Sequence, residues 1–281
     1  MWRCQHESRH VPRSLHLQRA VSSDGTRLAF FAAWLVVVLC PCNPRWQHVL
    51  ESTLQVAAAQ DGGAVLKALR KTKLPRNRRS PAFSRDPSLE ARGCTLGLTE
   101  DRCSRAAIMT AATRKRLELT QDLCKACRVA DPGFHFTSIQ VNLNAQYRMH
   151  TDGYDAGPSR MFCCGNFSRG RMWLHTWAGE RWTAVDVRER WVAFDGREFH
   201  LTEEWEGPER YSLVYFTHPA WQSQLLTSST LRQLEDLGFP WPTEQDTFEL
   251  QLPCSNERRP VAEQSLPPAL AAWERALPHE W

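Results

Sequence analysis

Three side chains of this sequence form a ligand set for a divalent metal: His150, Asp152 and His200. Two imidazoles and one carboxylate hold a divalent iron on one triangular face and leave its other positions for substrate chemistry. In an extended segment, residues i and i+2 point to the same side, so His150 and Asp152 can face one ion from a single strand end. His200 must then arrive from a strand that is distant in sequence and adjacent in space. The alternative is a pair of surface or core histidines that bind no metal.

A cationic segment, Arg210-x-Ser212, follows the third ligand. An iron enzyme that uses a small dicarboxylate must hold the far carboxylate while the near end chelates the metal. A guanidinium fork does this with two parallel charge-assisted hydrogen bonds, and Ser212 lies on the same face of the strand. The alternative for Arg210 is an ion pair with Glu206 or Glu209.

Further polar candidates lie close to the first ligand. Residues 136–147 alternate, with Asn142 and Asn144 on the face opposite the apolar residues. These two amides either touch the bound dicarboxylate or satisfy hydrogen bonds at a sheet edge. Tyr147 and Tyr154 are candidate walls of the pocket. We expect Asn144 and Tyr147 to join Arg210 and Ser212 in binding the cosubstrate.

Short β-type segments separated by turns surround these residues and predict a sandwich or barrel. The predicted strands are 136–147, 159–164, 171–176, 191–194, 198–201 and 211–217. Helices are predicted at 106–129, before an Asp-Pro-Gly turn, and at 228–237, before Gly238. A jelly roll brings remote strands together as the ligand set requires. We therefore expect a mainly β fold with flanking helices.

The charge of the chain is unevenly distributed along the sequence. Residues 1–92 hold 15 Lys and Arg against 6 Asp and Glu, and residues 93–281 hold 20 against 25. We predict a basic N-terminal extension over 1–92, a jelly-roll domain over 93–240 and a tail over 241–281. The extension contains an apolar segment at 28–40, too short for a confident membrane span, and a basic linker from Leu66 to Arg92. No transmembrane span is expected.

The ten cysteines are scattered over a chain long enough to fold without disulfides, so we interpret them as mostly reduced thiols. The closest spacing is Cys124-x-x-Cys127. Together with Cys94 and Cys103 it is a minor candidate for a structural zinc site.

Residues 136–217 resemble the iron(II)- and 2-oxoglutarate-dependent dioxygenases that have a double-stranded β-helix core. The resemblance lies in Ile139-Gln-Val-Asn-Leu-Asn144 before the first ligands, Trp191-Val-Ala-Phe-Asp-Gly196 before His200, and Arg210-Tyr-Ser-Leu-Val-Tyr-Phe216. One departure is Gly170-Arg171, where many members have Gly-Gly. The resemblance implies Fe(II) bound by His150, Asp152 and His200, and 2-oxoglutarate bound by Arg210 and Ser212. It also implies hydroxylation or demethylation of a C–H bond, with no further side-chain acid or base. The segment 154–159 also resembles the branch that oxidises methyl groups on DNA bases, and the branch is left open.

The sequence leaves three classes of function open. The leading one is the dioxygenase, the second a non-catalytic jelly-roll binding module, and the third a zinc-binding interaction protein. Protein side chains, nucleic-acid bases and small molecules all remain candidate substrates. The acidic folded part disfavours nucleic acid and the basic extension favours it. An intracellular location is favoured, with residues 1–42 as a candidate targeting segment.

Overall fold

The computed structural model describes residues 62–77, 82–83, 90–153, 155–176, 180–246 and 255–276. The predicted apolar segment 28–40 and the candidate pocket residue Tyr154 lie outside this part of the chain. Within it, no helix combines the length and the apolar character needed to cross a membrane.

The larger sheet has six antiparallel strands in the order β10-β6-β13-β4-β2-β3. In chain order they are β2 (Arg92–Glu100), β3 (Ala107–Met109), β4 (Ser138–Leu143), β6 (Ser159–Cys164), β10 (Trp191–Phe194) and β13 (Tyr211–Phe216). Four of them, β4, β6, β10 and β13, match predicted strands. The strand β2 is not recognised in the sequence because its two glycines, Gly93 and Gly97, interrupt the pattern.

The smaller sheet has three antiparallel strands in the order β11-β8-β9. They are β8 (Met172–Thr176), β9 (Arg181–Val185) and β11 (His200–Thr202). Two short pairs complete the set: β1 (Ala82–Phe83) with β5 (Gln146–Tyr147), and β7 (Ser168–Arg169) with β12 (Trp205–Glu206). An isolated antiparallel bridge between His150 and His200 extends the smaller sheet beyond β11.

The chain winds alternately through the two sheets. It passes from β4 to the His150 bridge, to β6, to β8 and β9, to β10, to β11 and to β13. Apart from the hairpin of β8 and β9, the chain therefore changes sheets at each step, and strands distant in sequence pair within a sheet, as β13 does between β4 and β6. This winding is a double-stranded β-helix, and it confirms the predicted jelly roll.

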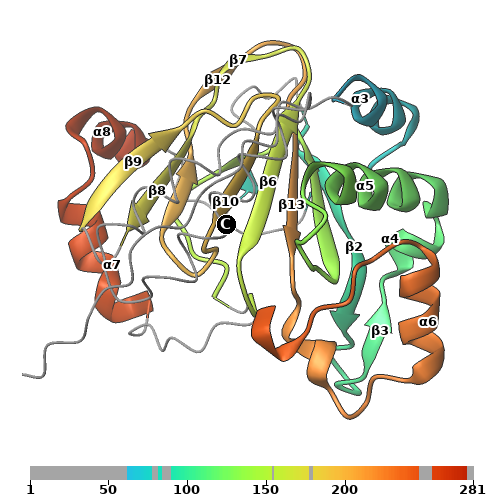
Figure 1. Ribbon diagram of the computed structural model, residues 1–281. Coiled ribbons are helices and arrows are strands. Elements are labelled where there is room, and N and C mark those ends of the chain that lie inside the picture. The colour runs from blue at the N-terminus through green and yellow to red at the C-terminus, as the bar shows by residue number, and fades with distance from the viewer. Residues whose placement is uncertain are drawn as a thin grey trace, which may run out of the picture. The chain divides into compact units, whose positions relative to one another are not determined.

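Helices cover the outer face of each sheet (Figure 1). Outside the larger sheet lie α3 (Gly62–Lys71), α4 (Ala111–Arg114), α5 (Leu117–Ala130) and α6 (Ser228–Asp236), and outside the smaller sheet lie α7 (Ser255–Gln264) and α8 (Pro268–Ala276). Short 3-10 turns occupy Pro219–Gln222 and Glu244–Asp246. Each sheet thus buries its outer face against helices, and the two inner faces meet each other.

Strand β6 shows how the layers are filled. Met161 and Cys163 point into the cluster between the sheets, whereas Phe162 and Cys164 point into the cluster under the helices. Successive strand residues face opposite sides, so adjacent cysteines enter different cores. Burial raises the pKa of the Cys163 and Cys164 thiols, because a thiolate would lose its hydration there.

The predicted helix at 106–129 is wrong in its first part. Residues 107–109 form β3, which pairs with β2 from Leu98 to Glu100. The chain then turns at Thr110, whose hydroxyl accepts from the Thr113 amide and caps α4. Pairing with a neighbouring strand outweighs the local helix propensity of this alanine-rich segment.

The predicted linker from Leu66 to Arg92 is wrong where the structure describes it. Helix α3 buries Val65 and Leu69, and Leu74 follows at 2% exposure. These residues belong to the same apolar cluster as α5 and the outer face of the larger sheet. The high basic content of this segment is typical of a linker, although its few apolar residues form one face of a short amphipathic helix.

The predicted tail over 241–281 also contains folded structure. Ala262 of α7, Leu270 of α8 and Leu266 in the turn between them are buried against Trp182 and Leu201 of the smaller sheet. The Trp182 indole N–H donates to the Ala262 carbonyl (2.9 Å). These helices close the outer face of the sheet that carries His200, which would otherwise expose aromatic and aliphatic side chains.

Candidate metal centre

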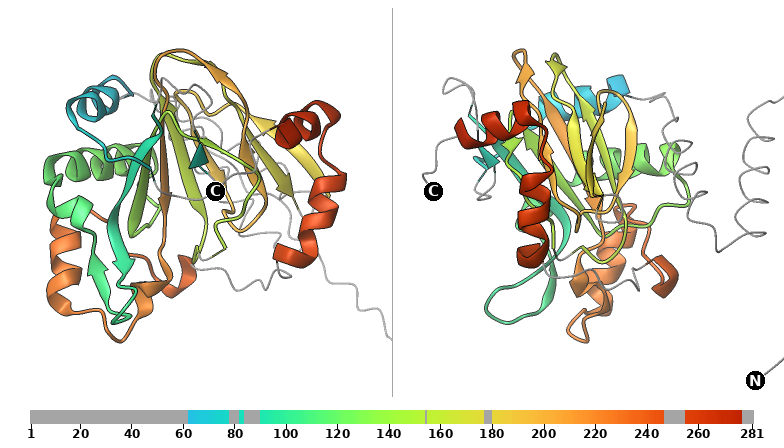
Figure 2. Two further views of the ribbon diagram at one scale, coloured as in Figure 1. Left: turned by 180° about the vertical axis from the view of Figure 1, so that it is seen from behind. Right: turned by 90° about the vertical axis from the view of Figure 1, so that its left-hand side faces the viewer.

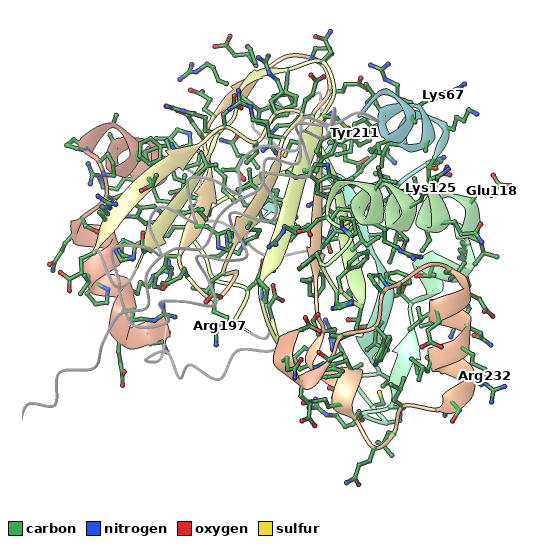
Figure 3. All side chains as sticks on the ribbon, in the orientation of Figure 1. Lys67, Glu118, Lys125, Arg197, Tyr211 and Arg232 are labelled. Atoms are coloured by element: carbon green, nitrogen blue, oxygen red, sulfur yellow. The ribbon has the colours of Figure 1, made fainter. Side chains whose placement is uncertain are left out.

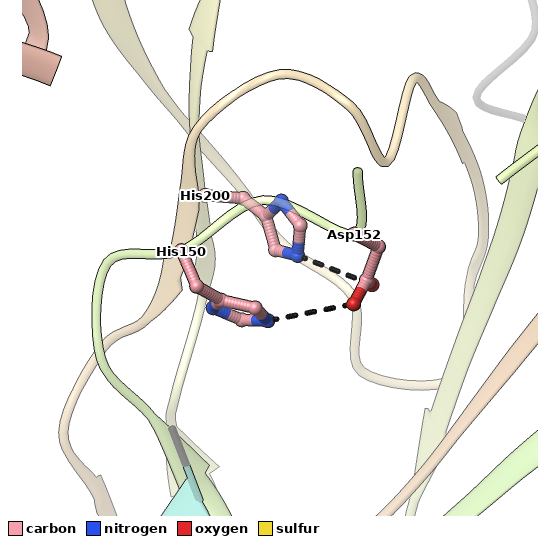
Figure 4. Close-up of side chains that lie close together, drawn as sticks. All are labelled: His150, Asp152 and His200. Atoms are coloured by element: carbon pink, nitrogen blue, oxygen red, sulfur yellow. Dashed lines mark ion pairs between the residues drawn. The ribbon is translucent and has the colours of Figure 1, made fainter. Parts of the chain in front are cut away.

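His150, Asp152 and His200 converge in the structure (Figure 4). The Nε2 atom of His150 lies 3.9 Å from one Asp152 carboxylate oxygen, and the Nε2 atom of His200 lies 3.7 Å from the other. One ligand atom from each residue lies within 4.8 Å of the other two. Metal–ligand bonds of about 2 Å place such atoms around a single ion. The predicted convergence of the three side chains is confirmed.

Backbone hydrogen bonds place the ligands. His150 and His200 exchange both of their N–H···O bonds, at 3.0 and 2.9 Å, across the isolated bridge. The Asp152 amide donates to the Gly196 carbonyl (2.7 Å). A side chain at position 196 would have its Cβ 3.4 Å from the Asp152 Cβ and still closer to the Asp155 carboxylate. The close approach of these two loops therefore favours glycine there.

The tautomer of each histidine suits a metal ligand. The Nδ1 atom of His150 donates to the Arg148 carbonyl (2.7 Å), and that of His200 donates to the Glu198 carbonyl (2.9 Å). A carbonyl only accepts, so Nδ1 carries a proton in each ring and Nε2, which faces Asp152, is the nitrogen that a metal would use. Metal-binding histidines typically donate their second nitrogen in this way. The donor set and its orientation fit Fe(II).

The ligands open onto a narrow cavity of about 30 Å³ between the sheets. The predicted pocket residues Ser212 and Tyr147 line it. Sequence reasoning did not assign a further set of lining residues: Gln140, Met161, Met172, Phe194, Thr202 and Val214. Strand alternation could have found several of them, because Gln140 shares a face with Asn142, and Val214 shares one with Ser212.

Asn142 is the centre of a hydrogen-bond network in the cavity wall. Its Oδ1 accepts from the Gln140 amide (2.8 Å) and from the Tyr147 hydroxyl (2.7 Å), and its Nδ2 donates to the Ser212 hydroxyl (3.2 Å). Thr95 donates to Gln140 from the neighbouring strand (2.7 Å). The network fixes the direction of each polar group on the inner face of the larger sheet.

Arg210 is buried to 1% exposure beside this wall. Its Nη2 donates to the Gly170 carbonyl (3.2 Å) and contacts the Cys163 sulfur (3.5 Å), and its Nε has no hydrogen-bond partner among the described residues. Within the same part of the chain it forms no ion pair. The alternative pairing is wrong, because Glu209 pairs with Arg70 and Glu206 pairs with Arg169. A fully buried guanidinium without a carboxylate is costly unless an anion binds beside it.

Gly170 permits this position of Arg210. Its φ is +71°, and a Cβ there would lie 2.7 Å from the Trp205 Cβ and 3.2 Å from the Arg210 Nε. Position 170 therefore favours glycine, because any side chain there would clash with Trp205 and crowd the Arg210 guanidinium. The next residue, Arg171, stands where many members of the resembled family have a second glycine, and it forms an ion pair with Glu203 (2.8 Å).

Asn144 lies outside the cavity. β4 ends at Leu143, and Asn144 has a φ of +54°, so the strand alternation that predicted its direction stops one residue earlier. Its Oδ1 accepts from the Arg210 amide (2.9 Å). Asn144 thus anchors the backbone of Arg210 rather than lining the pocket.

The zinc alternative is not supported by the arrangement of the cysteines. Cys124 and Cys127 are buried on α5, Cys103 is exposed, and Cys94 lies on β2. Among the described residues, His150, Asp152 and His200 are the one group of three or more such side chains close enough to share an ion.

The C-terminal helices brace the backbone next to two ligands. Arg258, at 3% exposure, donates to the Glu198 carboxylate (2.8 Å) and to the Arg197 carbonyl (2.9 Å), just before His200. Glu274 accepts from the Met149 amide (3.2 Å), just before His150. α7 and α8 thus hold both histidine-bearing segments from outside the smaller sheet.

No known family model matches this sequence, and no curated protein matches it. Solved structures with a similar fold do match. An oxidoreductase of the 2OG-Fe(II) oxygenase family from Burkholderia pseudomallei is 16% identical, covers 72% of this chain and 94% of its own, and has a TM-score of 0.41. A Pseudomonas putida prolyl-4-hydroxylase is 16% identical over 58% of this chain and 91% of its own, with a TM-score of 0.35. NgTET1, solved with 5mC DNA, is 15% identical over 62% and 76%, with a TM-score of 0.37. At these identities, the residue roles proposed below rest on the geometry of this chain.

Proposed function

We propose that the protein is an Fe(II)- and 2-oxoglutarate-dependent dioxygenase that hydroxylates or demethylates a C–H bond of its substrate. One observation carries the proposal. The His150, Asp152 and His200 cluster lies in the same fold layer as a buried guanidinium, that of Arg210, which has no carboxylate partner among the described residues. A cluster of metal-ligating side chains and a buried guanidinium without a carboxylate partner together fit a chelating dicarboxylate.

His150, Asp152 and His200 would hold the iron on one side. The bridge between the two histidine backbones keeps their Nε2 atoms on one side, and the two Nδ1 hydrogen bonds fix the rings so that both Nε2 atoms point inward. Iron and 2-oxoglutarate, when bound, would supply the oxidation of the substrate C–H bond by dioxygen: one oxygen atom enters the substrate and the other enters the succinate that is formed, with CO₂, from the 2-oxo acid. The protein then has to bind the iron, the cosubstrate and the substrate, orient them, and exclude water from the site.

Arg210 and Ser212 would bind the far carboxylate of the cosubstrate. Arg210, Ser212 and Val214 are each two residues apart and so lie on the same side of the chain, and Ser212 and Val214 line the cavity. The unpaired Nε of Arg210 is the donor that an incoming carboxylate would satisfy. Tyr147 and Ser212 are fixed by Asn142 and so present their hydroxyl groups in set directions.

The cavity is smaller than a five-carbon dicarboxylate. Its volume of about 30 Å³ is near that of one water molecule in the liquid. Met161 and Met172 form part of its wall. Methionine side chains are unbranched and change rotamer readily, so we expect cosubstrate entry to displace these two side chains.

An anaerobic titration tests the assignment. Full-length protein is loaded with Fe(II) and then titrated with 2-oxoglutarate, while the metal-to-ligand charge-transfer band is followed in the visible spectrum. Asp152→Ala is expected to abolish iron binding, and Arg210→Ala to keep iron but weaken 2-oxoglutarate binding. Arg232→Ala, an exposed arginine on α6, serves as the matched control and should behave as the wild type.

Two results would contradict the proposal. The first is a wild-type protein that binds iron without a charge-transfer band at saturating 2-oxoglutarate. The second is wild-type 2-oxoglutarate affinity in Arg210→Ala. A band without succinate release in air, across candidate substrates, would favour the non-catalytic binding module.

A further inference from the structure

All five lysines of this 281-residue chain lie around one cleft. They are Lys67, Lys71, Lys73, Lys115 and Lys125, and each of them lines the space of about 930 Å³ between α3 and α5. The arginines, by contrast, are spread along the sequence. Figure 3 shows Lys67 on α3 and Lys125 on α5 on the same side of the molecule. A concentration of this kind points to a function that needs ammonium groups at this place.

The described residues neutralise only part of the positive charge of the cleft. The five lysines and Arg114 are exposed, and none of these six forms an ion pair with any residue that the structure describes. Two exposed acidic residues, Glu118 and Asp122, share the lining. Every ion pair within the described ranges uses arginine or histidine as its cation, as Arg70 does with Glu209. The five lysines and Arg114 are thus available to a ligand in the cleft.

The cleft lies on the opposite side of the larger sheet from the metal centre. Leu123, Cys124 and Cys127 of α5 pack on the outer face of that sheet, whereas Ser212 and Val214 point from its inner face into the cavity. The view from behind in Figure 2 also places α3 beside α5, outside the sheet. A ligand in the cleft would therefore not occupy the site of the iron chemistry.

We propose that this lysine cleft binds the phosphate backbone of a nucleic acid, independently of its base sequence. Lysine carries a compact, mobile charge that attracts phosphate without a fixed geometry, whereas arginine binds phosphate or carboxylate through a rigid bidentate fork. Lys67 and Lys71 are one helical turn apart, so their charges lie on one face of α3 with a spacing of about 6 Å. No aromatic side chain is among the lining residues, so no base stacks there and the contacts are with the backbone alone. The proposal does not depend on the iron chemistry.

Direct binding is the first test. The full-length protein is titrated onto a fluorescein-labelled dT₂₀ strand, and anisotropy is measured at several salt concentrations. The variant Lys67→Gln/Lys71→Gln/Lys125→Gln is compared with Arg102→Gln/Arg190→Gln/Arg232→Gln, which removes the same charge from exposed arginines outside the cleft. We expect at least tenfold weaker binding for the lysine variant. The slope of log K against log salt should also fall by about 2, because each lost phosphate contact removes about 0.7.

The arginine variant separates the effect of the cleft from that of net charge. It should bind within about threefold of the wild type, because its charges lie elsewhere. Equal weakening of both variants, or wild-type binding by the lysine variant, would overturn the proposal. Circular dichroism and melting temperature are measured on all three proteins to confirm that each is folded.

Competition identifies the class of ligand. Unlabelled dT₂₀ should displace the probe, whereas polyglutamate of matched charge and inorganic tripolyphosphate should displace it at least tenfold less well per charge. Equal displacement by polyglutamate would reassign the cleft to acidic proteins. Equal displacement by tripolyphosphate would reassign it to small anions, and either result would overturn the proposal.

Amine chemistry offers an independent test, because the reagents report on this cleft and the α-amino group alone. Acetylation removes the lysine charge and reductive dimethylation keeps it. We expect acetylated protein to lose dT₂₀ binding and dimethylated protein to retain it. Bound dT₂₀ should also slow acetylation of Lys67 and Lys125, measured by peptide mass spectrometry. Equal rates with and without dT₂₀ would contradict the assignment.

Discussion

The two faces of the larger sheet are built from the same strands but differ in character: one packs in the apolar core, and the other lines the polar cavity. On β4 and β13, Ile139, Val141, Leu213 and Tyr215 are fully buried in the apolar cluster under the helices. The residues between them form a polar wall around the cavity: Gln140, Asn142 and Ser212. Arg210, just before β13, is buried beside this wall. Because strand residues alternate, stability and binding are separated by a single position in sequence. Substitutions on one face should therefore leave the property of the other face intact.

The largest expected effect is on the outer face. Leu213 is at 0% exposure and lies opposite Val141 and Phe162 in the sheet register. Leu213→Ala should lower the free energy of unfolding by about 3.5 kcal/mol, because it leaves a cavity in a packed core. Denaturant unfolding measures the loss, and Leu213→Met, which keeps most of the volume, should cost less than about 1.5 kcal/mol. Loss of iron affinity in the folded fraction would break the separation of the faces.

Arg210→Met, on the inner face, should weaken 2-oxoglutarate binding without lowering the free energy of unfolding. Loss of two charge-assisted hydrogen bonds is expected to raise the KM for 2-oxoglutarate about a hundredfold, or about 3 kcal/mol. The free energy of unfolding should stay the same or rise, since a buried charge without a carboxylate partner is replaced by an apolar chain. Steady-state succinate formation and denaturant unfolding give the two values. A strongly destabilised Arg210→Met would show that the guanidinium supports the fold.

Arg258→Met makes a matched comparison, because this second buried arginine pairs with Glu198. Its removal leaves a carboxylate at 15% exposure without that partner and frees the segment that holds His200. We expect both lower stability and about tenfold weaker iron binding, the lower end of what outer-shell changes cause. Iron affinity is measured by anaerobic competition with a chelator. Unchanged iron affinity would mean that α7 supports only the fold.

The smallest effect is expected at Ser212. Ser212→Ala removes one hydroxyl from the cavity wall and should raise the KM for 2-oxoglutarate about fivefold, or about 1 kcal/mol. Ser138→Ala is the control, because Ser138 is equally buried on β4 but donates to the Leu98 carbonyl. It should leave that KM unchanged. A similar rise in both variants would show that general loosening of the sheet, rather than the cavity wall, determines the affinity.

The histidine, aspartate and arginine positions could be predicted from the sequence because each depends on local periodicity. His150 and Asp152 share a side through the two-residue repeat of a strand, and the same repeat relates Ser212 and Val214 on the cavity wall. Asn144 could not be predicted in this way, because β4 ends at Leu143 and the positive φ of Asn144 reverses its direction. The C-terminal helices were missed for a different reason. Their apolar residues are few and are informative only once the sheet surface that they cover is known.

The sequence by itself determined which side chains are candidates for the metal site and the alternation that turns them inward, because residue type and strand period are local properties. Only the tertiary structure decided that Arg210 has no acidic partner among the described residues, although Glu206 and Glu209 are its neighbours in sequence. It also decided that the five lysines line one cleft. Both outcomes depend on which remote segments pack together, and that packing is set by the winding of the two sheets and the helices outside them.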